Sequence, residues 1–110
     1  MNASDRVVSL LKMLEKEPLD SFLNYALALE YHKQGKLQEA IQLILQLLNR
    51  DENYLGAYLQ LGQLLQEAGD LKEALSWYER GSSIAKIQKN TKTLSELNQA
   101  IQDIDEVFNE

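Results

Sequence analysis

Cysteine is absent from this 110-residue sequence, and histidine and proline each occur only once. The lack of cysteine excludes disulfide bonds and thiolate-bound metal, and a single histidine, His32, excludes a metal site with two histidine ligands. Positive charge is also scarce, because 11 Lys and Arg residues stand against 17 Asp and Glu residues, for a net charge of −6. Nucleic acid and anionic membranes attract concentrated positive charge, so neither is an expected partner.

Long apolar runs are missing as well. Asp5, Arg6 and Lys12 interrupt the apolar residues near the start, which argues against a signal peptide, and no stretch of about 18 apolar residues could span a bilayer. The composition, 45% hydrophobic and 25% charged, is typical of a globular protein. We therefore expect a single domain that covers residues 1–110 and a cytoplasmic location.

The apolar residues that are present recur at spacings of three and four. Leu23, Leu27 and Tyr31, for example, lie four residues apart. This period is that of an α-helix, and no stretch shows the alternation expected of a strand. The pattern predicts an all-α fold with about six helices, at 4–16, 21–33, 37–49, 53–67, 71–87 and 91–108. Because the connections are short, neighbouring helices should be antiparallel.

Glycine and capping residues mark the expected helix ends. Gly35 and Gly69 fall where a C-terminal glycine ends a helix and opens a turn. Pro18 supplies a break, and Asp20 and Ser21 are candidate N-caps for the helix that follows.

The segment 82–93 allows two interpretations. It forms either one long helix that frays, or a turn near Asn90 after which Thr91 or Thr93 caps the next helix.

One hexapeptide is nearly repeated. GKLQEA at 35–40 returns as GDLKEA at 69–74, a shift of 34 residues that also places Leu27 on Leu61 and Ala28 on Gly62. A fixed period between about 20 and 50 residues, with two helices in each period, is typical of a solenoid.

The repeated positions resemble those of the tetratricopeptide repeat family. Its 34-residue unit carries a large residue, Leu-Gly and a second large residue on one helix, then Ala and an aromatic residue on the next. The matching residues are Tyr58, Leu61, Gly62, Leu65, Ala74 and Tyr78 in the second unit, and Leu27, Ala28, Tyr31, Ala40 and Ile44 in the first. The resemblance implies a right-handed α-solenoid of antiparallel helix pairs, with repeats at 21–54 and 55–88. The helix at 4–16 and a capping helix at 91–108 would then cover the two ends.

Small side chains give these positions a physical meaning. Gly62 and Ala28, together with Ala40 and Ala74 on the partner helices, let neighbouring backbones approach closely. We expect Gly56 to serve close packing in the same way.

No constellation of residues points to catalysis. His32 would have to act from the middle of a helix, and no serine has the glycines of a nucleophile elbow. The acidic run from Asp103 to Glu106 lacks the spacing of a calcium loop, and no glycine-rich phosphate loop is present. We therefore expect no enzyme activity, no bound metal and no cofactor.

In a stack of helix pairs, the first helix of each pair lines the hollow side. The repeat frame places these residues there as candidates for peptide binding: Phe22, Tyr25, Leu29, His32, Lys33, Leu59, Gln60, Gln63, Glu67 and Gln99. The capping helix would add Ser95, Glu96 and Asp103. A subgroup of the resembled family grips a carboxylate tail with Lys, Asn and Arg, but apolar residues and glutamines occupy those places here, so that mode is not expected. Phe22, Tyr25 and Leu29 could equally pack beneath the N-terminal helix.

Two classes of function remain open. The first is an adaptor that binds a peptide or protein segment, of unidentified nature, in the hollow face. The second is an assembly element, such as a homodimer, that associates through apolar helix surfaces. The surplus apolar residues at Val7, Leu11, Leu14, Leu43 and Leu45 favour the second class.

Overall fold

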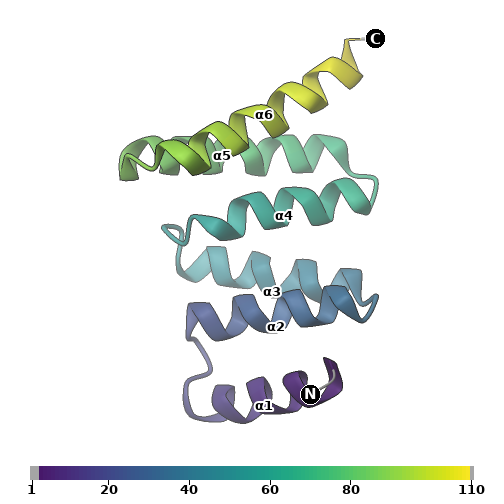
Figure 1. Cartoon of the computed structure of the whole chain (residues 1–110), viewed down its shortest axis with the longest axis vertical. Coiled ribbons are helices and arrows are strands. Elements are labelled where there is room, and N and C mark those ends of the chain that lie inside the picture. The colour runs from purple at the N-terminus through teal and green to yellow at the C-terminus, as the bar shows by residue number, and fades with distance from the viewer. Residues whose placement is uncertain (1–2, 110) are drawn as a thin grey trace. The chain divides into compact units, whose positions relative to one another are not determined.

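The computed structural model describes residues 3–109. These residues fold into six α-helices joined by short connections (Figure 1). The helices are α1 (Ala3–Lys16), α2 (Ser21–Lys33), α3 (Leu37–Arg50), α4 (Gly56–Glu67), α5 (Leu71–Gln88) and α6 (Thr91–Phe108). Residues 3–109 contain no strand, so the predicted all-α fold is confirmed.

The helices group into two compact units, Met1–Glu52 and Asn53–Glu110. The first unit holds α1, α2 and α3, and the second holds α4, α5 and α6. Within each unit the middle helix packs against both of its neighbours, and successive helices run in opposite directions (Figure 1). The predicted repeat boundaries at 54/55 and the single domain over 1–110 stay predictions.

The first unit is held together by apolar side chains between α2 and α3. Ala28 and Ala40 are fully buried, so the two helices approach closely at these points, and Leu27, Ile44 and Leu47 fill the space around them. Each large side chain that is fully buried contributes roughly 1.5–3 kcal/mol. The predicted role of the two alanines in close packing is confirmed.

A buried carboxylate joins α1 to α2. Glu30 of α2 is 7% exposed, and its Oε1 accepts from Arg6 Nε of α1 at 3.0 Å and from Lys33 Nζ at 3.4 Å. Burial by itself raises the pKa of Glu30, but the hydrogen bonds and positive charges of Arg6 and Lys33 outweigh it, so the pKa is lowered. The other oxygen, Oε2, is buried and has no hydrogen-bond partner among residues 3–109.

The second unit is built around two glycines. A Cβ placed on Gly62 of α4 would overlap the ring of Tyr78 of α5, and one placed on Gly81 of α5 would lie 2.5 Å from Tyr58 Cβ and 3.3 Å from Leu97 Cδ1. These three large side chains are almost fully buried. The absence of a side chain at Gly62 and at Gly81 therefore lets α4 and α6 both pack tightly onto α5. Close packing at Gly62 was predicted, whereas the role of Gly81 was missed.

The expected helix ends are mostly confirmed. Gly35 and Gly69 have φ angles of 78° and 86°, the left-handed conformation that glycine adopts without strain. Asp20 is the N-cap of α2 and accepts from the backbone N–H of Leu23 at 2.8 Å. Ser21, the other candidate, lies inside the helix, and its hydroxyl donates to Asp51 at 2.6 Å.

The segment 82–93 forms a turn, as one of the two interpretations had it. α5 ends at Gln88, Lys89 adopts a left-handed conformation with φ of 57°, and α6 begins after Asn90. The N-cap is Asn90 itself, which accepts from the backbone N–H of Thr93 at 3.0 Å, so the expectation that Thr91 or Thr93 would cap α6 was wrong.

The start of the fourth helix was predicted three residues too early. α4 begins at Gly56 because the backbone N–H groups of Ala57 and Tyr58 bond to Tyr54 and Leu55, in the tighter i to i−3 pattern of a turn. Gly56 is exposed at the first position of the helix. The expected role of Gly56 in close packing was therefore wrong.

Candidate functional site

An open hollow lies between α4 and α6 within the second unit. Its volume is about 440 Å³. The lining residues are Leu59 and Gln63 from α4, and Ser95, Glu96, Gln99, Ala100 and Asp103 from α6. α4 and α6 are separated in sequence by α5, and together they form one surface.

Helical periodicity brings these side chains to the same side. Leu59 and Gln63 are one turn apart on α4, and on α6 Glu96, Ala100 and Asp103 follow at steps of four and three residues. Gly81 lets Leu97 press against α5, and the hollow is lined by the neighbouring face of α6, which carries Glu96, Gln99 and Asp103.

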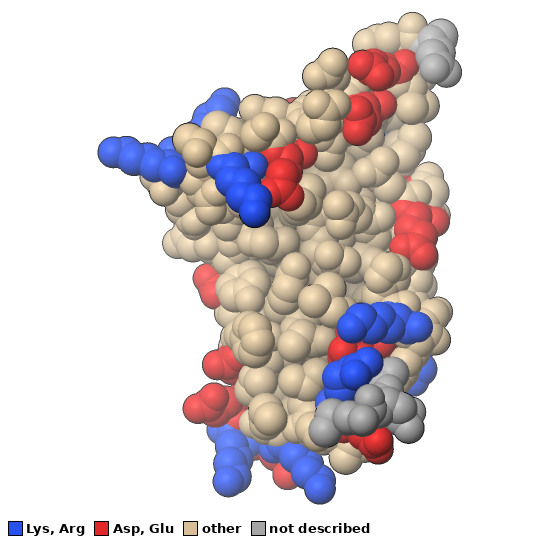
Figure 2. Space-filling view, in the orientation of Figure 1, with Lys and Arg blue, Asp and Glu red and all other residues tan. Residues whose placement is uncertain are grey.

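The hollow carries negative charge. Glu96 and Asp103 are its ionisable residues, and no Lys, Arg or His is among the described residues that line it. The side-chain amide of Gln99 donates from Nε2 to Asp103 Oδ1 at 2.9 Å, which orients that carboxylate. Acidic side chains also gather over the C-terminal half of α6 in Figure 2.

The charge of Asp103 reaches the core of the unit. Tyr78 is fully buried behind α4, and its hydroxyl donates to Gln66 Oε1. Burial raises the pKa of Tyr78 to about 12, and the negative charge of Asp103 adds to this effect.

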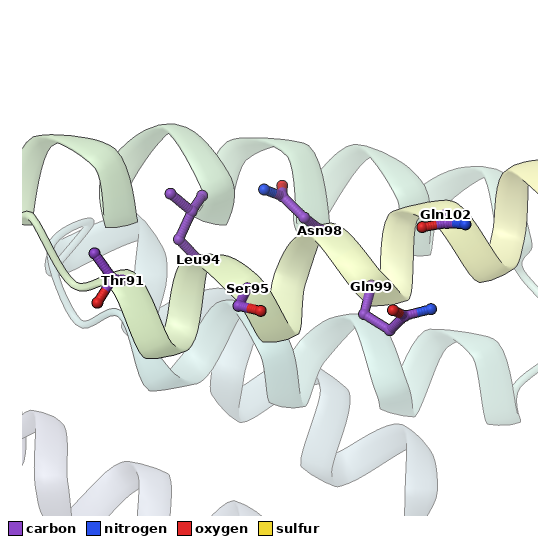
Figure 3. A pocket seen from close by; sticks show the side chains of 6 residues that line it. All are labelled: Thr91, Leu94, Ser95, Asn98, Gln99 and Gln102. Carbon is purple, nitrogen blue, oxygen red and sulfur yellow. The ribbon is translucent and has the colours of Figure 1, made fainter.

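A second open hollow, of about 370 Å³, runs along α6 alone. Figure 3 shows Ser95, Asn98, Gln99 and Gln102 projecting from successive turns of this helix, and Thr91 and Leu94 complete the set. Asn98 Oδ1 accepts from the Ser82 hydroxyl of α5 at 3.0 Å. The amides of Gln99 and Gln102 make this surface polar. Ser95 and Gln99 also line the hollow between α4 and α6.

The first unit has a hollow of a different character, of about 390 Å³, where α1 ends and α2 begins. Met13, Phe22 and Leu23 supply apolar surface, and Phe22 is 64% exposed. Lys16, Glu17 and Asp20 lie at its rim. Phe22 was predicted as a site residue, whereas Met13 and Leu23 were not.

The structure brings some of the predicted site residues together and not others. In the second unit, Leu59, Gln63 and Gln99 share the hollow, as do Ser95, Glu96 and Asp103. Gln60 is half-buried and Glu67 is exposed, and neither lines it.

In the first unit, Tyr25, Leu29 and His32 are half-buried on α2. Lys33 is exposed and forms an ion pair with Glu30 at 3.4 Å. Of the five candidates on this helix, Phe22 lines the hollow where α1 ends and α2 begins, and the other four do not line that hollow.

Ala100 is the lining residue that sequence reasoning missed. The signal was available, because Ala100 lies four residues after Glu96 and three before Asp103, which places it on the same helical face.

Comparison with known proteins identifies the family. A sequence profile described as "Tetratricopeptide repeat" matches residues 31–86, and a second with the same description matches residues 9–42. The chain belongs to the tetratricopeptide repeat family. Members of this family are in general non-catalytic modules for protein–protein interaction, and they typically bind proteins or peptides.

Solved structures agree with this assignment. The crystal structure of a tetratricopeptide repeat domain protein from Salinibacter ruber has 32% sequence identity and a TM-score of 0.74, over 78% of this chain and 96% of that one. The type III secretion translocator chaperone SycD of Yersinia enterocolitica has a TM-score of 0.89 at 14% identity, over 98% of this chain and 75% of that one. The TPR2B domain of yeast Sti1, in a complex with pHsp70, has a TM-score of 0.83 at 19% identity, over 94% and 85%.

The last two similarities concern the fold, and they confirm the predicted solenoid-like architecture. No curated protein matches the sequence. Within the residues that the structure describes, no three or more His, Cys, Asp or Glu side chains form a group that could hold a metal ion. None of the described helices combines the length and the apolar character needed to cross a membrane.

Proposed function

We propose that this tetratricopeptide repeat protein binds a peptide or a segment of another protein in the hollow between α4 and α6. The observation that carries the proposal is the hollow itself, in which an apolar side chain, two glutamine amides and a serine hydroxyl converge from two helices. This combination suits a peptide, since apolar surface anchors side chains and amides bond to an extended backbone.

The glutamines are suited to that role by their chemistry. An amide group both donates and accepts, so Gln63 and Gln99 can bond to either group of a peptide backbone. Gln63 is exposed, so its amide is open to a ligand. Leu59 is half-buried and offers apolar surface beside it.

A structural neighbour gives this proposal a precedent. The structure of the TPR2B domain of yeast Sti1 is that of a complex with pHsp70, so a chain of this fold does bind a partner. At 19% sequence identity this similarity supports a common fold and does not identify the partner of this chain.

Selection of peptides tests the proposal. A phage-displayed library of random heptapeptides is selected on the wild-type protein, and the Kd of the selected peptides is measured for Gln63→Ala and for Gln46→Ala. Gln46 is an exposed glutamine on α3 and serves as the matched control. A lost hydrogen bond costs about 0.5–1.5 kcal/mol, so Gln63→Ala should raise Kd about 2- to 13-fold. If no peptide is selected, or if both variants bind like the wild type, the assignment of the site is wrong.

The α2 candidates are tested by the same selection, as a separate site in the first unit. Tyr25→Ala should weaken the binding of peptides that bind to α2. Unchanged binding of every selected peptide would remove Tyr25 from the candidates.

Self-association is the second candidate function, and exposed apolar side chains of the first unit favour it. Val8, Leu11, Met13, Leu19 and Phe22 are each between 44% and 66% exposed. Sedimentation velocity over a concentration series would detect a dimer, and Leu19→Ser combined with Phe22→Ser should abolish it. A monomer at every concentration would remove this candidate.

A further inference from the structure

We propose that the hollow between α4 and α6 selects a partner segment by a lysine or arginine side chain, which it holds between Glu96 and Asp103. This inference rests on the proposed function and adds to it the chemical class of the ligand.

The two carboxylates are placed to act together. Glu96 and Asp103 are seven residues apart, so they lie on the same face of α6 about 10 Å apart along its axis. Neither forms an ion pair with a cationic side chain among residues 3–109, and the amide of Gln99 holds Asp103 in position. Lys92 lies one helical turn before Glu96 but forms no ion pair with it, so a cation that enters the hollow meets two carboxylates without an ion-pair partner among the described residues.

Apolar surface lies between the charges. Ala100 is half-buried midway between Glu96 and Asp103, and Leu59 faces it from α4. Lysine and arginine place their methylene groups on apolar surface while the charged end stays at a polar rim. The hollow thus provides a place for each part of such a side chain.

Charge also decides against the other occupants. α6 carries a single lysine, Lys92, against four carboxylates, and the whole chain has a net charge of −6. An acidic segment would be repelled, and so on average would a second copy of this chain. A basic segment of another protein is the complementary partner.

A peptide array provides the test. Heptapeptides selected on the wild-type protein are resynthesised with acetylated and amidated ends, and each position is replaced in turn by Lys, Arg, Gln, Glu or norleucine. Norleucine matches the length of lysine without its charge. Binding is compared among wild type, the double variant Glu96→Gln, Asp103→Asn and the double variant Asp105→Asn, Glu106→Gln. The second double variant removes two charges from the same helix outside the hollow, so it controls for net charge.

The expected result is that one position requires Lys or Arg and that norleucine there weakens binding. Exposed ion pairs are typically worth 0.2–1 kcal/mol, so each carboxylate lost from the hollow should raise Kd about 1.5- to 5-fold. The Kd of the Asp105→Asn, Glu106→Gln variant should stay close to that of the wild type. The difference in Kd between the wild type and the Glu96→Gln, Asp103→Asn variant should become smaller at high salt.

Three results would overturn the inference, and they differ from failure of the proposed function. If the peptides depend on Gln63 but tolerate norleucine or Glu at every position, the proposed binding site stands and the preference for a cation is refuted. An equal loss in both double variants would show an effect of net charge rather than of the hollow. Self-association that the Glu96 and Asp103 variant abolishes would make the occupant a second copy. Selection of no peptide at all would overturn the proposed function together with the inference.

Discussion

Replacement of Gly62 by alanine tests how tightly α4 and α5 are packed. In an exposed helix the change should stabilise the protein by about 1 kcal/mol, because glycine is the poorer helix former. Here the new Cβ would overlap Tyr78 Cε1 and would lie 2.5 Å from Tyr78 Cδ1 and Cζ, more than 1 Å inside ordinary van der Waals contact at its nearest point. Overpacking of this kind costs about 1–3 kcal/mol, and the buried Tyr78 ring, tied to Gln66 through its hydroxyl, has little room to move.

Because the overlap is severe, its cost should lie in the upper part of this range, at about 2–3 kcal/mol. After the gain of about 1 kcal/mol in helix propensity is subtracted, Gly62→Ala should lower the free energy of unfolding by about 1–2 kcal/mol. For a domain of this size each kcal/mol corresponds to a shift of about 4–8 °C in Tm. Thermal and urea denaturation followed by circular dichroism would measure both quantities. Gly56→Ala is the matched control, since Gly56 is exposed in the same helix and should be neutral or slightly stabilising.

A double-mutant cycle identifies the cause. In a Tyr78→Leu background the ring is gone, so Gly62→Ala should regain part of the stability that it costs in the wild type. If Gly62→Ala were stabilising in the wild type, or equally costly without the ring, the packing argument would be refuted.

Three further substitutions have expected outcomes. Ala74→Leu should lower the stability by about 1–3 kcal/mol, since Ala74 is fully buried between helices, and an unchanged Tm would contradict this. The pKa of Tyr78 is raised to about 12 in the fold, so its contribution to stability is complete below pH 10 and is lost as the pH rises towards 12. Chemical denaturation between pH 9 and 12 should accordingly show a steeper loss for wild type than for Tyr78→Phe, and parallel curves would exclude this role. Lys89→Gly should stabilise the α5–α6 turn by about 1 kcal/mol because φ is 57° there, whereas a lower urea midpoint would mean that the lysine side chain matters more than backbone strain.

Local spacing was enough to predict most of the fold. The recurrence at three and four residues located six helices, and Gly35 and Gly69 ended two of them with the expected left-handed backbone. The start of α4 was missed because contacts far apart in sequence influence the preceding turn. The carbonyl of Asn53 accepts from Gln88 Nε2 at 2.8 Å, a partner 35 residues away that local propensity does not reveal.

The candidate site was predicted less completely. The repeat frame brought Leu59, Gln63 and Gln99 to one surface. Gly81, which lets α6 pack closely against α5, was overlooked because Leu47 occupies the equivalent place in the first repeat. A row of small residues at Ala74, Gly81 and Ala85, all buried, was the available signal.

The attachment of α1 gives the first unit a weak point. From Asp5 to Lys16 no side chain of this helix is fully buried, so fraying should begin here and hydrogen exchange should be fastest along its backbone. If α1 detached from α2, water would reach Glu30 and would hydrate Oε2, which has no hydrogen-bond partner among the described residues. Hydration offsets part of the energy lost with the Arg6 contact, which makes excursions of the N-terminal helix easier than its apolar side chains alone would suggest. In a truncated protein that starts after Lys16, the carboxylate of Glu30 would be exposed to solvent at all times.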